Sequence, residues 1–222
     1  PLIGIAYAIV VGADVLTTGN HVWDKRERST YIYKNERLLR PMNMIDGTPG
    51  TGITSIKTNA GRIGVANVMT NLFMSKTDPV FDKIPDIIDS FKLSENVDFA
   101  LVDVHGEASS EKMAIGYALD GNVSAVVGTH THVPTADHQV LEKGTAYITD
   151  VGMSGDYNSI IGMNKEDALN RFKFPNNKKS RLEVSLGEPT LCGVVIDTHS
   201  NGLSKSIKPI RLGGRLEQAI PV

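Results

Sequence analysis

The sequence has little of what marks secreted, membrane-spanning or nucleic-acid-binding proteins. It contains one cysteine, Cys192, so no disulfide can form within the chain, and the apolar residues around it are typical of a buried strand. No apolar run reaches the roughly 18 residues that a membrane-spanning helix needs. The formal net charge of -2 provides no basic field for an extended polyanion. We therefore expect a globular protein with no membrane contact and no extended nucleic-acid binding.

The length and composition are those of a single globular domain. The chain has 222 residues, of which 41% are hydrophobic and 22% charged, which is enough apolar material for one substantial core. We therefore expect residues 1–222 to form one domain, with a small cap or hairpin insertion at about 40–75. A division into two independent domains is not required.

The order of apolar patterns predicts an α/β fold with a central sheet flanked by helices. Almost continuous apolar runs over 98–104 and 123–128 are typical of buried parallel strands, and a shorter strand is expected over 146–149. The segments 53–58 and 62–69 flank Asn59-Ala-Gly61, which predicts a hairpin. Helices are expected over 2–11, 24–33, 81–93 and 109–119. From 181 onward the pattern predicts strands broken by a turn at 199–202, and hence an antiparallel section.

The order of elements at the start of the chain predicts a further strand before the first helix. The chain begins at Pro1, and its opening helix leads directly into a strand expected over Asp14–Thr18. In an α/β fold a strand usually precedes such a helix. We therefore expect at least one βα unit before Pro1.

Histidines follow three of the predicted strands. His21, His105 and His130 come at or just after the ends of these strands, and His132 lies two residues further on. Ligands of open α/β sheets bind beyond the carboxyl ends of the strands, so these side chains should meet in one crevice. The remaining histidines, His138 and His199, lie in polar, turn-rich stretches typical of the surface.

Several imidazoles in one crevice favour a metal site. Neutral imidazole binds Zn, Fe and related ions, whereas imidazoles without a metal repel one another when protonated. His130 and His132 could serve two neighbouring ions, or one could bind a metal while the other supports it. Two ions about 3.5–4 Å apart can bind a phosphoryl group and activate a bridging water. A single histidine at a strand end is more often structural, so only their joint occurrence favours this chemistry.

Several longer strings carry a resemblance to a known family. Gly19-Asn-His21 and Gly128-Thr-His-Thr-His132 resemble the signatures of calcineurin-like metallophosphoesterases. The strings 14–25, 102–112, 126–137 and 149–155 narrow the resemblance to the bacterial YmdB-like phosphodiesterases, over roughly residues 12–210.

The resemblance implies a role for each matching residue. It implies that Asn20, His105 and His130 hold the second metal ion and that His132 binds the first. It implies that His21 is catalytic, donating a hydrogen bond or proton to the phosphoryl group without binding a metal. It further implies two divalent ions, iron or manganese with zinc or magnesium as alternatives, a cytoplasmic location, and a cyclic nucleotide or related small phosphodiester as substrate. The sequence leaves open whether the protein is a monomer or a homo-oligomer.

The chain departs from the family pattern at one point. The family also uses an Asp at the end of its first strand and an acidic residue in a Gly-Glu-Asn segment, and neither is found in this sequence. We therefore expect an additional βαβ-type section of at least roughly 30 residues at the N-terminus. A non-catalytic regulator with the same fold and a protein phosphatase are the alternative functions.

Overall fold

A six-stranded sheet forms the centre of the molecule. The computed structural model describes residues 8, 10–24, 32–33, 35–175 and 182–221, so most of the helices expected over 2–11 and 24–33 lies outside the described residues. The strands pair in the order β1-β2-β3-β4-β6-β5. In chain order they are β1 (Ile53–Thr58), β2 (Gly61–Met69), β3 (Phe99–His105), β4 (Ala125–Thr129), β5 (Gln139–Val140) and β6 (Ala146–Ile148). This confirms the predicted mixed α/β fold with a central sheet.

Strands β2, β3, β4 and β6 run parallel, and the two edge strands are antiparallel to their neighbours. The predicted hairpin is present as β1 and β2, and its second strand pairs directly with β3 inside this sheet. The register places Met69 beside His105, and His105 beside Thr129. The carboxyl ends of three parallel strands therefore lie at one edge of the sheet.

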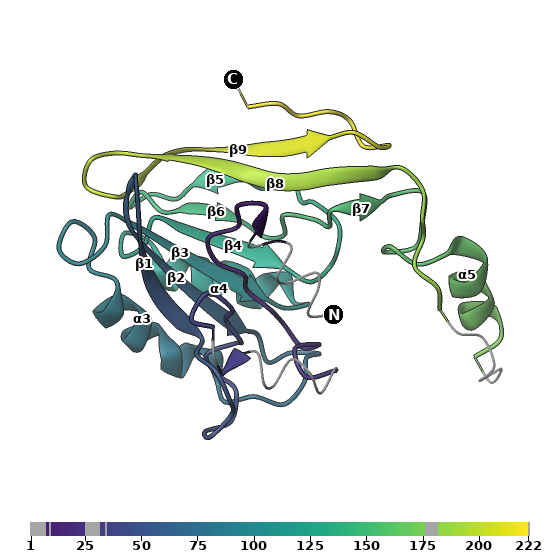
Figure 1. Ribbon diagram of the computed structural model, residues 1–222, viewed down its shortest axis with the longest axis horizontal. Coiled ribbons are helices and arrows are strands. Elements are labelled where there is room, and N and C mark those ends of the chain that lie inside the picture. Colours follow the sequence, from purple (N-terminus) through teal and green to yellow (C-terminus); the bar gives the residue numbers. More distant parts are fainter. Residues whose placement is uncertain (1–7, 9, 25–31, 34, 176–181, 222) are drawn as a thin grey trace.

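Two helices cover one face of the sheet. The 3₁₀-helix η1 (Val80–Lys83) leads into α3 (Ile84–Ser90), and α4 (Ser109–Leu119) follows β3 (Figure 1). The main core cluster joins Ile87 of α3 and Ile115 of α4 to Val102 and Val126 of the strands. The prediction of a single helix over 81–93 is wrong in its bounds, because a 3₁₀-helix over Val80–Lys83 precedes an α-helix over Ile84–Ser90. Pro85 lacks an N–H and is tolerated in the first turn of a helix, so the α-helix begins there after a separate 3₁₀ turn.

A second, antiparallel sheet lies on the opposite face. It contains β7 (Gly155–Asp156), β8 (Pro189–Thr198) and β9 (Ser204–Leu212). The C-terminal pattern predicted the antiparallel pair β8 and β9, but not β7. Ile207 of β9 packs in a second core cluster with Val127 and Ile148 of the central sheet. Figure 1 shows the long β8–β9 hairpin along the sheet, with α5 (Lys165–Lys173) set apart at one end of the molecule.

The strand predicted over 14–18 is not formed as a strand. Leu16 makes only an isolated parallel bridge to Leu38. The partner segment enters a loop within three residues, at Pro41, which has no N–H to continue a ladder. The segment is held in place by this bridge and by the hydrogen bond from Oγ1 of Thr18 to the carbonyl oxygen of Leu39 at 2.8 Å. No helix in the described part of the chain is long and apolar enough to cross a membrane.

Candidate metal centre

Three side chains from distant parts of the sequence meet at the carboxyl edge of the central sheet. Nε2 of His105 lies 3.0 Å from Oδ1 of Asn20 and 3.1 Å from Nδ1 of His130. The His105 and His130 rings are arranged edge to face with centroids 4.8 Å apart. The structure thus brings together the three side chains that the resemblance assigned to the second metal ion.

The hydrogen-bond network assigns the tautomer of His105. Oγ1 of Thr129 lies 2.8 Å from Oδ1 of Asp103 and 3.0 Å from Nδ1 of His105. A hydroxyl has one proton, and Thr129 donates it in a hydrogen bond to the buried carboxylate of Asp103. The hydroxyl oxygen therefore accepts a hydrogen bond from Nδ1–H of His105. Nε2 of His105 therefore turns an unprotonated lone pair toward the Asn20 oxygen. Two acceptors facing each other call for a cation or a donor between them.

The environment favours neutral imidazoles. Burial lowers the pKa of His105 to about 4, with the neighbouring His130 as the next cause. Burial also lowers the pKa of His130, although Glu107 opposes the shift with Oε2 at 3.3 Å from Nε2. Both rings are therefore uncharged at neutral pH, which is the form that binds a metal ion.

The donor set fits part of the coordination of one divalent ion. Ligands that each lie about 2.0–2.2 Å from an ion are about 3 Å apart, which is the distance of Nε2 of His105 from each of the other two atoms. Among the described residues, no group of three or more His, Cys, Asp and Glu side chains is arranged to hold a metal. The third donor of this set is the amide oxygen of Asn20, and the set contains no carboxylate.

Close backbone packing brings the Asn20 segment against His105. A Cβ atom built on Gly19 would lie 2.2 Å from Nε2 of His105, so only glycine allows this approach. His130 and His132 both adopt positive φ angles, 109° and 68°, which are uncommon for residues with a side chain. The loop after β4 is therefore held in a specific, strained shape.

A buried ion pair holds that loop. Nζ of Lys112, from α4, lies 3.0 Å from Oδ2 of Asp150 and donates to the carbonyl of Thr129 at 2.8 Å. The side chains of Lys112 and Asp150 are 0% and 1% exposed. The same Oδ2 accepts from the N–H of Thr131 at 2.9 Å. The pair thus binds the backbone on both sides of His130, which places that imidazole.

His21 and His132 lie in different surroundings. Nδ1 of His21 lies 2.8 Å from Oδ2 of Asp24, and both side chains are largely exposed. Nδ1 of His132 lies 2.9 Å from the carbonyl oxygen of Ile161 and donates to it. The roles expected for these two histidines remain predictions.

The sequence did not single out Asp103, Thr129, Glu107, Lys112 or Asp150. These residues are charged or polar and lie inside or beside predicted apolar elements. That position could have marked them as functional, because buried charged groups need specific partners. Nothing in the spacing showed which groups these five residues would contact.

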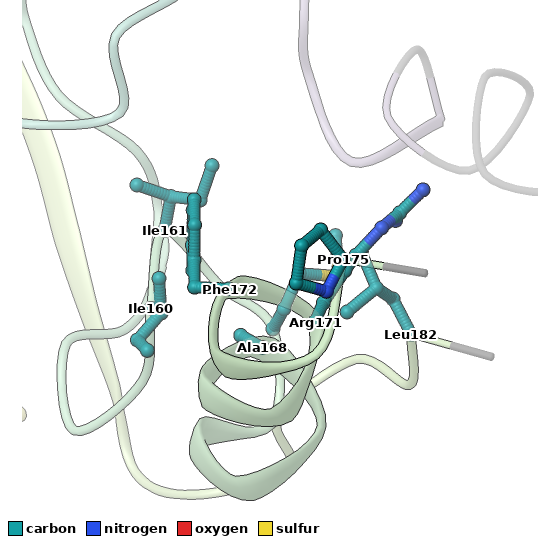
Figure 2. Close-up of a pocket in the computed structure, with 8 residues that line it drawn as sticks. Ile160, Ile161, Ala168, Arg171, Phe172, Pro175 and Leu182 are labelled. Carbon is teal, nitrogen blue, oxygen red and sulfur yellow. The ribbon is translucent and has the colours of Figure 1, made fainter. Parts of the chain in front are cut away.

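The largest of the described pockets lies away from this centre. It has a volume of about 460 Å³ and lies between α5 and the loop before it. Figure 2 shows Ile160 and Ile161 on one side and Ala168 and Phe172 of α5 on the other. Its lining is mainly apolar and holds no group of potential metal ligands.

These features, a mixed α/β sheet with imidazoles at its carboxyl edge, agree with the comparisons. Residues 5–210 match the YmdB-like protein family, and the chain belongs to this family. The chain is 47% identical over 186 residues to the 2',3'-cyclic-nucleotide 2'-phosphodiesterase of Bacillus subtilis, covering 84% of this chain and 69% of that protein. The resemblance identified from the motifs is thereby confirmed.

Two crystal structures share the fold. A protein from Thermus thermophilus superposes with a TM-score of 0.84 at 35% identity, covering 96% of this chain and 81% of that one. A phosphatase from Mycoplasma pneumoniae gives a TM-score of 0.84 at 31% identity, covering 96% and 76%. The relatives with a stated activity are hydrolases of phosphoric esters, and the prediction of a hydrolase is confirmed at that level.

Proposed function

We propose that this protein is a metal-dependent phosphodiesterase with a calcineurin-like metallophosphoesterase fold, acting on 2',3'-cyclic nucleotides or related small phosphodiesters. The observation that carries the proposal is the meeting of Nε2 of His105, Nδ1 of His130 and Oδ1 of Asn20 at one point. The activity of the Bacillus subtilis relative supports the choice of substrate. A 3',5'-cyclic nucleotide is the alternative substrate, and a cytoplasmic location belongs to the same proposal.

Asn20, His105 and His130 would hold one divalent ion, and His132 would take part in holding another. Iron or manganese is proposed, with zinc or magnesium as alternatives. A bound divalent ion supplies a water of lowered pKa and neutralises charge on the phosphoryl group. Asp103, acting through the Thr129 hydroxyl, would keep Nδ1 of His105 protonated and leave Nε2 free to bind the ion.

His21 would act on the phosphodiester itself. Its Nδ1 contact with Asp24 fixes the ring from one side, at an exposed position next to Asn20. From there it can donate a hydrogen bond or proton to a phosphoryl or leaving-group oxygen. Such help typically contributes about 10²- to 10⁴-fold to a rate.

A substrate and metal assay tests the proposal. The protein is stripped with a chelator, reloaded with Mn²⁺ or Fe²⁺, and given 2',3'-cyclic AMP and 3',5'-cyclic AMP in parallel. Turnover that requires the added ion and favours the 2',3'-isomer is expected. No turnover of either diester by the metal-loaded protein, with folding verified by circular dichroism, would contradict the proposed function.

A further inference from the structure

A second cavity adjoins the candidate centre and shares Asn20 with it. It has a volume of about 290 Å³. Its lining residues come from three loops and the end of β2: Asn20, Trp23, Met44, Ile45, Thr48, Met69, Ser75, Lys76 and Thr77. Asn20 lies 3.0 Å from His105, and Met69 is the register neighbour of His105. A ligand in this cavity would therefore touch the edge of the centre.

One buried side chain holds the cavity's walls together. The side chain of Asn43 donates to the carbonyl of Met69 at 2.8 Å, to Oγ1 of Thr77 at 3.1 Å and to the carbonyl of Asp78 at 2.9 Å. Its Oδ1 accepts from the N–H of Met69 at 2.9 Å. Asn43 is 0% exposed, so these bonds are shielded from water. The loop that carries Met44 and Ile45 is thus fixed against β2 and against the segment around Thr77.

The lining combines a flat aromatic group with apolar and polar neighbours. Nε1 of Trp23 donates to Sδ of Met44 at 3.3 Å, which orients the indole within the cavity wall. Met44 and Ile45 add apolar surface, while Thr48 and Ser75 bring hydroxyl groups. An aromatic face beside a few hydrogen-bonding groups is the chemistry that recognises a nucleobase, since stacking of a base contributes about 1–3 kcal/mol.

The size of the cavity limits what it can hold. Pockets for whole drug-sized ligands span about 300–1,000 Å³, so a cavity at the lower end accommodates one flat ring system rather than a whole nucleotide. We propose that this cavity receives the nucleobase of the substrate while the phosphodiester lies at the Asn20–His105–His130 cluster. This inference rests on the proposed function and adds the element that selects a nucleotide over a simple diester.

Trp23 provides a direct test, because the chain contains one tryptophan. Adenosine 3'-monophosphate, a product-like probe, is titrated into the metal-loaded protein while tryptophan emission is recorded. Saturable quenching is expected with this probe and with adenosine, but not with ribose 3-phosphate. Unchanged emission, or equal quenching by ribose 3-phosphate, would overturn the assignment of the cavity to the base.

Kinetics on a surface variant give a second test. Ile45 is 59% exposed, so Ile45→Asn should fold while removing apolar surface from the cavity; Ile220→Asn, at a 67% exposed position elsewhere, is the matched control. Ile45→Asn should raise KM for 2',3'-cyclic AMP about 10-fold with kcat little changed. It should leave turnover of methyl riboside 2',3'-cyclic phosphate, which lacks a base, unaffected.

The two failures are distinguishable. If the metal-loaded protein hydrolyses neither diester, the proposed function fails, while quenching by adenosine still reports whether the cavity binds a base. Suppose instead that 2',3'-cyclic AMP and methyl riboside 2',3'-cyclic phosphate are both hydrolysed. If Ile45→Asn then changes KM equally for the two substrates, or for neither, the base assignment fails and the phosphodiesterase activity stands.

Discussion

The candidate centre depends, at the scale of single residues, on one hydroxyl group and one missing side chain. Thr129 holds the His105 ring through Nδ1, so the ring cannot turn aside when a neighbour approaches. Gly19 is that neighbour, and its lack of a Cβ atom leaves the space in which Asn20 meets the imidazole. The geometry of the candidate metal ligands is therefore set as much by these two residues as by the ligands themselves.

Gly19→Ala should disrupt the centre. The new Cβ would lie 2.2 Å from Nε2 of His105, and either the ring or the Asn20 segment would have to move. We expect Mn²⁺ affinity, measured by calorimetry, to fall at least about 10-fold, the lower end of effects seen for lost supporting contacts. Gly193→Ala is the control, because a Cβ there meets no atom within 4 Å. Equal affinities of the two variants would contradict the packing argument.

His21 and His130 separate chemistry from metal binding. His21→Ala should leave metal content nearly unchanged and lower diester turnover by about 10²- to 10⁴-fold, because it removes proton or electrostatic help at the phosphoryl group. His130→Ala should lower both metal occupancy and rate, because it removes a donor from the cluster. Metal analysis and kinetics on the folded variants check this. Equal metal loss in both would refute the role of His21, and unchanged rates in both would refute the catalytic interpretation.

At the scale of elements, the loop after β4 is positioned by a helix and by the segment after β6. Lys112 extends from α4 and Asp150 follows β6, and their buried contact reaches the backbone of Thr129 and Thr131. This arrangement couples the packing of α4 on the sheet to the position of His130. It also explains how the positive φ angle of His130 is maintained.

Lys112→Met should therefore cost both stability and metal affinity. Removing one member of a buried ion pair leaves an unpaired charge and costs about 3–5 kcal/mol of unfolding free energy. The double variant Lys112→Met/Asp150→Leu should regain part of that stability but not the Mn²⁺ affinity, because Asp150→Leu also removes the acceptor of the Thr131 N–H. Urea denaturation and calorimetry measure the two quantities. Lys205→Met, at an exposed position of β9, is the control, and full recovery of affinity in the double variant would contradict the positioning role.

Tyr147 of β6 links strand and helix and should give an alkaline pH dependence. Burial raises the pKa of Tyr147 to about 12, and its hydroxyl contacts Oγ1 of Thr149 at 3.0 Å. The unfolded chain therefore loses this proton first, near pH 10, so unfolding becomes easier as the pH rises from 10 toward 12. The free energy of unfolding should therefore fall between pH 9 and pH 11 in the parent. In Tyr147→Phe this fall should be smaller by on the order of 1 kcal/mol. Tyr117→Phe, at a 57% exposed position, should behave like the parent.

The sequence predicted those elements whose patterns are local. The hairpin around Gly61 and the helix ended by Gly121 were predicted because glycine with positive φ marks each turn, and both are present. The two-residue strands β5 and β7 were missed because they are too short to show a period. Helix α5 was missed because its residues are mostly polar, although Asn164 caps its N-terminus by accepting from Glu166 and Asp167.

The candidate site was predictable to a similar extent. His105 and His130 could be placed together because the ends of buried parallel strands share one edge of a sheet. The partners of these histidines could not be predicted. The register between strands decides which side chain of β3 faces Thr129, and the sequence does not show that register. The contact of Lys112 with Asp150 joins residues 38 positions apart, and no local pattern encodes it.

At the scale of the whole molecule, the candidate centre and the core beneath the β8–β9 hairpin lie in different parts of the structure. The centre lies at the carboxyl edge of the central sheet, where β3 and β4 end. The β8–β9 hairpin instead covers a face of that sheet through Ile207 and its neighbours Val127 and Ile148 (Figure 1). A change in the hairpin's core should therefore alter the unfolding equilibrium without moving the metal ligands.

Ile207→Ala tests this separation. Ile207 is 7% exposed, and truncating a buried Ile costs about 2–5 kcal/mol because contacts are lost and a cavity remains. Urea denaturation should show that loss, while Mn²⁺ affinity and kcat/KM per folded molecule, measured well below the unfolding midpoint, should stay within about twofold of the parent, since sites without shared partners act independently. Ile220→Ala, at a 67% exposed position, should change neither quantity appreciably. If metal affinity fell in step with stability in Ile207→Ala, the centre would depend on the packing of the hairpin and the two layers would not be separable.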